Sequence, residues 1–298
     1  MRAGRSTGAQ GGTTHMQPED IASRLSELVS LPRAYHRISE MIDDERYGAA
    51  DIGRVISHDP ALTARLLRLV NSAYYRLPRH VDTVPLAINV VGTRALHELV
   101  LATAVASAFS RIDTRLVDMA DFWHHSIYCG LMARLLSREL DVGEAEQAFI
   151  AGLLHDLGKL ALYHELPDET EDILETFAET DTPLHAVERE QLGFDHADVG
   201  GALLKAWDLP AVYREAVGCH HRPGESRLYR DEACLVHAAN ALSKPVEPGH
   251  KVRREAVSEP ELDPAAAERI RLDAGQVESL RVEADLQSIE VYATLFGR

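Results

Sequence analysis

Cysteine is scarce in this sequence. The chain has three, Cys129, Cys219 and Cys234, which are far apart and include no C-x-x-C pair. That pattern argues against a disulfide framework. It favours reduced thiols that fill the core of a cytoplasmic protein.

Long apolar runs are also missing. The longest, LVLATAVASAF at residues 99–109, is about half of the roughly 20 residues that a membrane helix requires. We therefore expect a buried helix there and no membrane association. Residues 1–16, MRAGRSTGAQGGTTHM, lack the apolar segment of a secretory signal, so we expect them to form a disordered extension.

Basic residues are outnumbered, with 31 Lys and Arg against 47 Asp and Glu, and the formal net charge is -16. This balance disfavours broad electrostatic binding to nucleic acid or to an anionic membrane. A local basic pocket remains compatible with it.

The period-2 alternation of β-strands is almost absent, whereas apolar residues recur at helical spacing. In SHDPALTARLLRLVNSAYY, residues 57–75, Asp59 can cap a helix that begins at Pro60, and Leu62, Leu66 and Leu69 share one face. The sequence predicts an all-α, multi-helical bundle. The 298 residues, 45% of them hydrophobic, can fill a sizeable core.

We expect three parts after the N-terminal extension. Residues 17–115 form an N-terminal helical subdomain, and residues 116–245 form a second helical block with most of the histidines. Residues 246–298 form a charged loop followed by helical pattern from 264 to 296.

The stretch AGLLHDLGKLAL, residues 151–162, places His155 beside Asp156 in an apolar run. Burying ionisable groups is costly unless they find a metal, a counter-charge or hydrogen bonds. On one helix the side chains of these neighbours diverge by about 100°, so both must bend towards one point to bind the same cation. Asp156 could also bridge this cation to a second one. Small residues at 148, 151 and 152 allow another helix, carrying His125, to approach. Imidazole and carboxylate ligands suit zinc, iron, manganese or nickel.

Several motifs occur in an order that resembles one known family. FWHHS, AGLLHDLGKL, FDHADVGGALLKAWDLP and CHHRP are similar to the HD superfamily of metal-dependent phosphohydrolases, in the branch called HDOD. LPRAYHRISEMI, ISHDPALTARLLRLVNSAYY and VPLAINVVGTRALHELVLATAV resemble the helical N-terminal half that distinguishes HDOD proteins. The resemblance covers residues 21–245.

The resemblance implies an all-helical bacterial signalling output module with a metal site. The residues that match the superfamily's metal-ligand positions are His125, His155, Asp156, His196, His220, His221 and Asn240. Lys159 matches the lysine that contacts a phosphate oxygen in catalytic relatives. No organic cofactor is indicated.

Two departures bear on catalysis. Asn240, in LVHAANALSK, stands where catalytic relatives place their final aspartate, and an amide removes one negative charge from the metal site. The chain continues HHRPGESRLYRDE after the histidine pair, without the Gly-Tyr-Pro segment of relatives that cleave cyclic di-GMP. We therefore predict a regulatory, non-catalytic or degenerate metal-binding protein that acts through a signalling protein partner or a small nucleotide or phosphate ligand. The alternative is a metal-dependent phosphohydrolase or phosphodiesterase with Asn240 as a weaker ligand.

Two assignments stay open in the sequence. A single histidine on an apolar face is more often a hydrogen-bonded core residue than a ligand, and either His124 or His125 could face the site. The NSAYY stretch, residues 71–75, could be a recognition patch, but we favour a helix end whose tyrosines pack between the two blocks. The sequence does not determine the oligomeric state.

Overall fold

The computed structural model describes residues 16–42, 44–109, 112, 114–246 and 262–297. Over these residues the chain forms sixteen α-helices and two short 3-10 helices, and no strand. This confirms the predicted all-α fold. The predicted extension, apart from Met16, and most of the predicted loop after residue 246 lie outside the described residues.

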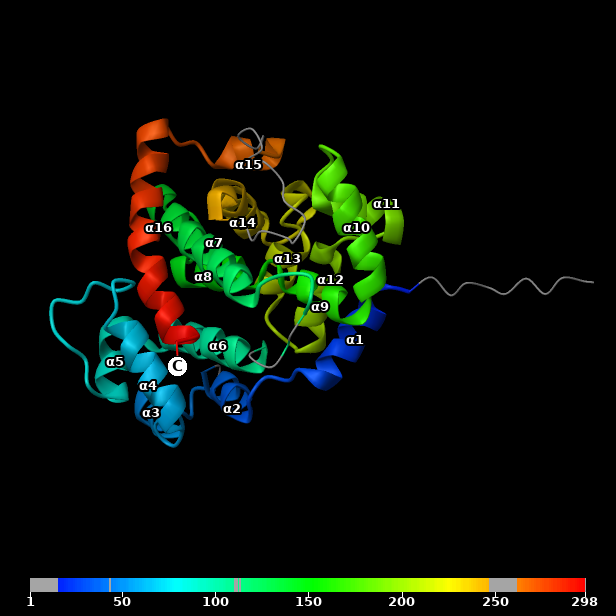
Figure 1. Cartoon of the computed structure of the whole chain (residues 1–298). Coiled ribbons are helices and arrows are strands. Elements are labelled where there is room, and N and C mark those ends of the chain that lie inside the picture. Colours follow the sequence, from blue (N-terminus) through cyan, green and yellow to red (C-terminus); the bar gives the residue numbers. More distant parts are fainter. Residues whose placement is uncertain (1–15, 43, 110–111, 113, 247–261, 298) are drawn as a thin grey trace, which may run out of the picture.

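A first group of helices packs together at one end of the molecule (Figure 1). The group comprises α2 (Arg33–Ile42), α3 (Ala49–Ser57), α4 (Pro60–Val70), α5 (Val84–Val91) and α6 (Thr93–Phe109). As predicted, Asp59 caps α4: its Oδ1 accepts from the backbone N–H groups of Ala61 and Leu62, both at 3.0 Å. Pro60 occupies the first turn, where its missing N–H costs nothing.

A second group includes the long helix α7, which packs on α8 and α14, and holds most of the histidines. It comprises α7 (Met119–Leu140), α8 (Ala145–Leu154), α9 (Leu157–Glu165), α10 (Pro167–Glu179), α11 (Leu184–Leu192), α12 (His196–Ala206), α13 (Ala211–Gly218) and α14 (Arg230–Leu242), with a 3-10 turn at Pro223–Glu225 and another at Lys244–Val246.

The helices at the two ends of the chain pack on the second group. α1 (Pro18–Leu28) lies against α12 and α9, and the Trp207 indole donates to the backbone carbonyl of Val29 at 3.0 Å. α15 (Pro264–Arg269) packs on α14, and α16 (Ala274–Leu295) runs along α7 (Figure 1). α1 therefore lies beside the histidine-bearing helices, although it precedes the first group in sequence.

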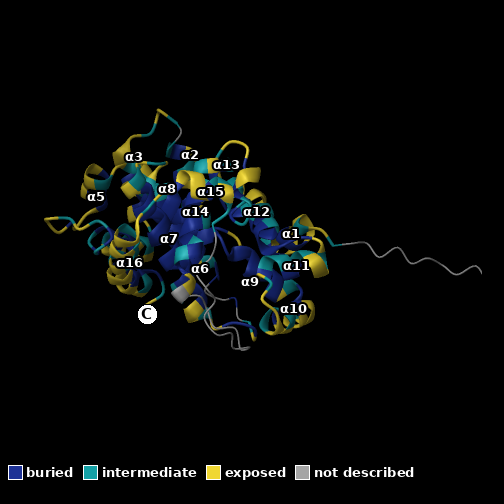
Figure 2. Cartoon of the chain, turned by 90° about the horizontal axis from the view of Figure 1, so that it is seen from above, coloured by how far each residue is buried: buried dark blue, intermediate teal, exposed yellow. Residues whose placement is uncertain are grey.

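The predicted buried helix at 99–109 is the C-terminal part of α6, which lies between the two groups. Nearly every side chain from Leu96 to Phe109 is buried (Figure 2). In the described part of the chain, no single helix is long and apolar enough to cross a membrane. Only together would α5 and α6 be long and apolar enough, and the chain bends by 117° at their junction.

The NSAYY stretch ends α4 and joins the two groups. The Asn71 side chain donates to the carbonyls of Leu67 and Val81, both at 2.7 Å, and accepts from the N–H of Val81 at 2.8 Å. Tyr74 packs edge-on against Phe149 of α8, with ring centroids 5.0 Å apart. These contacts confirm the structural interpretation of the stretch.

Candidate functional site

His155 and Asp156 lie at a break between two helices, not within one helix as the sequence suggested. α8 ends at Leu154 and α9 begins at Leu157. The backbone of Asp156, with φ -99° and ψ 5°, leaves the helical path. This turn removes the divergence expected for neighbours on one helix, and both side chains reach a common point: His155 Nε2 lies 3.2 Å from Asp156 Oδ2.

A first group of possible ligands forms around this doublet. His125, on α7, places its Nε2 3.6 Å from Asp156 Oδ2. All three side chains are fully buried. Their nitrogen and oxygen atoms lie within 4.8 Å of one another, close enough for one metal ion.

A second group contains three histidines from segments that are distant in sequence. His196 is the first residue of α12, and His220 and His221 follow the end of α13 at Gly218. Their ligand atoms also lie within 4.8 Å of one another. The rings of His220 and His221 are 3.9 Å apart, and the Nε2 atoms of His196 and His221 are 2.8 Å apart.

Asp156 connects the two groups. Its Oδ2 faces His125 and His155, while its Oδ1 lies 3.3 Å from His196 Nε2. The His155 and His220 rings are neighbours as well, with centroids 5.1 Å apart. The structure therefore brings five histidines and one carboxylate into one buried cluster.

Three of these imidazoles are anchored through Nδ1. His155 Nδ1 lies 2.7 Å from the Gly152 carbonyl, and His220 Nδ1 lies 2.7 Å from the Val217 carbonyl. His196 Nδ1 lies 2.6 Å from the Glu188 carboxylate. A carbonyl can only accept, so Nδ1 of His155 and of His220 must carry the proton. Nε2 of each ring then faces the cluster and offers its lone pair whenever the ring is neutral, as in a metal-ligating histidine.

Several buried nitrogens of the cluster make no well-aligned protein hydrogen bond in the described structure. They are Nε2 of His155, which faces Asp156 Oδ2 at 3.2 Å, Nε2 of His220 and both ring nitrogens of His125. Buried polar atoms are normally satisfied. Such a concentration in one place could hold a ligand that accepts lone pairs.

The start of α12 is fixed by a buried ionic network. Asp195 caps the helix through the N–H groups of Ala197 and Asp198. Arg189 and Arg222 each donate to Asp195 Oδ2 at 2.8 Å. Burial raises the pKa of Asp195, but neighbouring positive charge and hydrogen bonds more than offset this and hold it well below its usual range. The network sets the position of His196, the next residue.

The cluster strongly perturbs protonation. Burial lowers the pKa of His125 to about 3 and also holds those of His220 and His221 well below their usual value. For His196, burial lowers the pKa, but the charge of Glu188 and the hydrogen bonds to Asp156 and Glu188 together outweigh burial and raise the pKa to about 9. For His155, burial lowers the pKa, but Asp156 and Cys129 together outweigh burial and raise the pKa.

Asp156 stays ionised in this environment. Burial raises its pKa, but the charges of His155 and Lys159 and the hydrogen bonds bring it well below its usual value. Lys159 Nζ donates to Asp156 Oδ2 at 2.8 Å. The lysine that the resemblance assigns to a phosphate is thus also a counter-charge for the buried carboxylate.

The structure also places the two remaining candidates from the sequence, His124 and Asn240. His124 is half-buried and faces Tyr292, with ring centroids 6.4 Å apart, so His125 is the histidine that joins the cluster. Asn240, half-buried on α14, is close enough to offset a small part of the burial effect on the His125 pKa.

Sequence reasoning missed three residues that support the cluster. Glu188 holds His196, and His185 stacks on His221 with ring centroids 3.9 Å apart. His237 Nδ1 lies 2.8 Å from the His220 carbonyl. The spacing of His185 and Glu188 on α11 gives the sequence no signal, because their partners lie on other elements.

Close helix packing makes the convergence possible. A Cβ added to Gly158 of α9 would lie 1.8 Å from the carbonyl oxygen of His196, and one added to Gly152 of α8 would lie 2.7 Å from the Cα of Gly130 on α7. Both contacts are closer than any side chain allows. These glycines bring α9 onto α12 and α8 onto α7.

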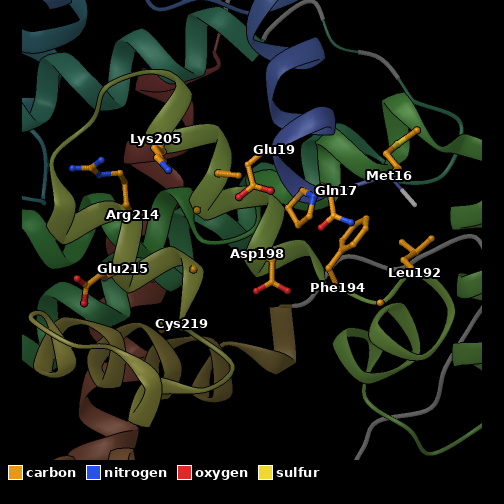
Figure 3. A pocket seen from close by; sticks show the side chains of 15 residues that line it. Met16, Gln17, Glu19, Leu192, Phe194, Asp198, Lys205, Arg214, Glu215 and Cys219 are labelled. Carbon is orange, nitrogen blue, oxygen red and sulfur yellow. The ribbon is translucent and has the colours of Figure 1, made fainter. Parts of the chain in front are cut away.

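A cavity of about 670 Å³ lies on the other face of α12 (Figure 3). Asp198, Gly201, Ala202 and Lys205 contribute one side of that helix, and α1, α13 and the end of α11 supply the rest. None of the clustered histidines lines it. α12 therefore separates this cavity from the histidine cluster.

Comparison with known proteins identifies relatives. The family model of the HDOD domain matches residues 28–223. An uncharacterised protein of Treponema pallidum (strain Nichols) is 28% identical over 222 residues, which are 74% of this chain and 43% of that protein, so the chain spans less than half of the relative's length.

Solved structures share the fold. A protein of Shewanella amazonensis SB2B, whose name proposes a phosphohydrolase, aligns with a TM-score of 0.71 and 24% identity over 92% of this chain and 97% of that one. A protein of Marinobacter aquaeolei VT8, whose name proposes signal transduction, aligns with a TM-score of 0.64 and 22% identity over 96% of this chain and 62% of that one.

Proposed function

The chain belongs to the HDOD domain family, and from that premise we propose that it is a cytoplasmic signalling output module that holds a divalent transition metal and acts through a protein partner. The proposed ligands are His125, His155, Asp156, His196, His220 and His221, with Asn240 beside them. In this proposal the metal ties together helix ends that would otherwise leave buried nitrogens unpaired.

The observation that carries this proposal is the direction of the ring nitrogens. Three imidazoles, those of His155, His196 and His220, are held from outside the cluster through Nδ1. Nε2 of His125, His155 and His196 lies 3.2–3.6 Å from the Asp156 carboxylate. A cluster of core histidines without a ligand role would satisfy its inward nitrogens, because unpaired buried groups cost about 1–3 kcal/mol each.

The donor set favours zinc, iron, manganese or nickel. Imidazole nitrogen and carboxylate oxygen are borderline-to-hard ligands that suit these ions. The buried cysteine of α7, Cys129, influences the pKa of His155 but belongs to neither group of possible ligands. The two groups, joined by Asp156, fit one or two ions.

Two features of the cluster support regulation over turnover. Asn240 supplies an amide where catalytic relatives have a carboxylate, which lowers the negative charge available to the metal. Lys159 Nζ is bound to Asp156 and is only 5% exposed, so it offers a phosphate little access.

A metal-dependent phosphohydrolase is the second candidate, and the bridging position of Asp156 favours it. Two ions held by a shared carboxylate would supply an activated water and charge for a phosphate oxygen. The residues' own contributions would be orientation of the ligands by Glu188 and the helix-end carbonyls, and a positive charge from Lys159.

Metal content and turnover test the two candidates together. Protein purified without chelator is analysed for transition metals and assayed on generic phosphodiesters and cyclic dinucleotides with added manganese or iron. We expect metal in the wild type, loss of it in His125→Gln and retention in the neighbouring His124→Gln, with no turnover. Metal-free wild type under ample supply would refute metal binding. Hydrolysis abolished by His155→Ala would establish the enzyme.

A further inference from the structure

The outer face of α16 carries an apolar stripe that no described segment covers. Val282, Leu286 and Ile289 are 50%, 63% and 71% exposed. The opposite face, which includes Leu280, Ala284 and Val291, is buried, and the helix packs on α7. Figure 2 shows exposed residues along the outer side of this helix.

The stripe has the spacing of a coiled-coil seam. Exposed positions 275, 279, 282, 286, 289 and 293 alternate steps of four and three residues. This is the interval of heptad a and d positions, with the three large apolar side chains at the centre and Gly, Ser and Ala towards the ends. The seam therefore fits the apolar side of another helix.

Acidic residues flank this seam on both sides. Glu278 and Asp285 lie along one edge, and Glu283 and Glu290 along the other, in the e and g positions of the same heptads. The one cation of α16, Arg281, lies off the seam. A partner therefore meets an apolar strip between two acidic edges, on one of which Arg76 already pairs with Glu283.

This charge pattern argues against a second copy of the chain. In a parallel pair, e and g positions of opposite copies face each other, and in an antiparallel pair, e faces e and g faces g. Every such flanking contact among the four acidic residues would place acid against acid. Like charges so placed are destabilising and act against self-pairing.

The helix is held along the edge of the seam that carries Glu283 and Glu290. Glu290 accepts from the backbone N–H of Ala73 at 2.7 Å, and Glu283 lies 3.2 Å from Arg76. Both contacts fix α16 to the turn that follows α4. A preformed helix loses little conformational entropy when a partner docks.

We propose that the exposed face of α16 docks an amphipathic helix of a partner protein, with apolar residues in its seam and Lys or Arg on its flanks. This proposal rests on the proposed function, since it names the partner chemistry of the signalling module. Apolar burial supplies affinity, and charge complementarity selects the partner. α16 lies beyond the region matched by the family, residues 28–223.

Two designed helical peptides test the proposal. Both carry the same Leu and Ile seam; one has Lys at its flanking positions and the other Glu. Binding to the full chain is followed by fluorescence anisotropy of the labelled peptide. We expect the Lys peptide to bind, the Glu peptide to bind at least tenfold more weakly, and added salt to weaken the Lys peptide because it screens the flanking charges.

Surface variants locate the contact. Leu286→Gln combined with Ile289→Gln should weaken the Lys peptide at least tenfold, whereas Leu28→Gln, at a residue of α1 that is 61% exposed, should not. Circular dichroism confirms that each variant folds. Equal binding of both peptides, no binding of either, or no effect of the double variant overturns the proposal. A wild-type dimer in sedimentation that the double variant dissociates overturns it too, because a second copy is then the occupant.

Metal content is measured separately on the same protein preparations. Peptide binding to His125→Gln should equal that of the wild type, because α16 docking does not require an occupied histidine cluster. Wild-type protein that holds metal but does not bind the Lys peptide refutes the docking proposal alone, and wild-type protein that binds the Lys peptide but holds no metal refutes metal binding alone.

Discussion

The Nε2 atoms of His196 and His221 lie 2.8 Å apart, although one residue begins a helix and the other follows the end of a different helix. Each ring is held from behind, His196 by Glu188 and His221 by the stacked ring of His185. Two ring nitrogens at this distance share a proton or direct their lone pairs at one cation. Proton and metal are therefore expected to compete for this pair.

Glu188→Gln should weaken metal binding by about 10- to 100-fold, the usual effect of losing a carboxylate behind a metal-ligating histidine. The amide keeps the size of the side chain but loses the charge that orients and polarises His196. Competition against a metal-binding dye measures the affinity. Glu190→Gln, two residues along α11, is the control, and equal affinity of the two variants would contradict the role assigned to Glu188.

Metal uptake should strengthen as pH rises from about 7 to 9. In the metal-free state the pKa of His196 is raised to about 9, so a proton occupies the ring below that pH and must leave before Nε2 can bind metal. The same titration at several pH values measures the slope. In Glu188→Gln the slope in this interval should flatten, because the charge that raises the pKa is gone. A pH-independent wild type would count against a ligand role for His196.

Gly158→Ala should destabilise the protein by roughly 1–3 kcal/mol or more, since overpacking at a close helix contact forces the backbone to move. The added methyl group would lie 1.8 Å from the His196 carbonyl oxygen. Gly53→Ala in α3 is the matched control, because its Cβ would meet only ordinary contacts at 3.5 Å and beyond, and alanine favours a helix interior. Chemical denaturation compares them, and equal stability would contradict the close packing of α9 on α12.

Glu98 should make stability depend on pH between about 4.5 and 7. This buried carboxyl of α6 accepts a hydrogen bond from the Tyr213 hydroxyl, and burial raises its pKa to about 7. Between these pH values the folded state binds a proton that the unfolded state releases. The protonated Glu98 therefore stabilises the fold fully below pH 4.5, and this contribution to the free energy of unfolding, about 3 kcal/mol in all, is lost as pH rises through 7.

Glu98→Gln tests this contribution, because glutamine can accept the same hydrogen bond without ionising. We expect the difference in unfolding free energy between wild type and variant to change across that pH range, in favour of the variant at high pH. A constant difference would show that Glu98 does not titrate as stated. Glu27→Gln on α1, away from the core, serves as the control.

Local signals in the sequence determined much of this protein. The helical period, the Asp59 cap and the Asp195 cap with Asp198 depend on residues within one or two turns of each other, so they could be predicted from the chain alone. The motif order identified the family and named His125, His155, Asp156, His196, His220 and His221 before any of them could be placed in space.

Tertiary structure decided how those residues meet. The break between α8 and α9, the choice of His125 over His124, and the supporting roles of Glu188 and His185 all depend on contacts between separate helices. α1 likewise joined the second helical group, because its apolar face found α12. Sequence patterns specify which face of a helix is buried, but the close approaches at Gly152 and Gly158 determine which other helix that face meets, and so where the ligand atoms converge.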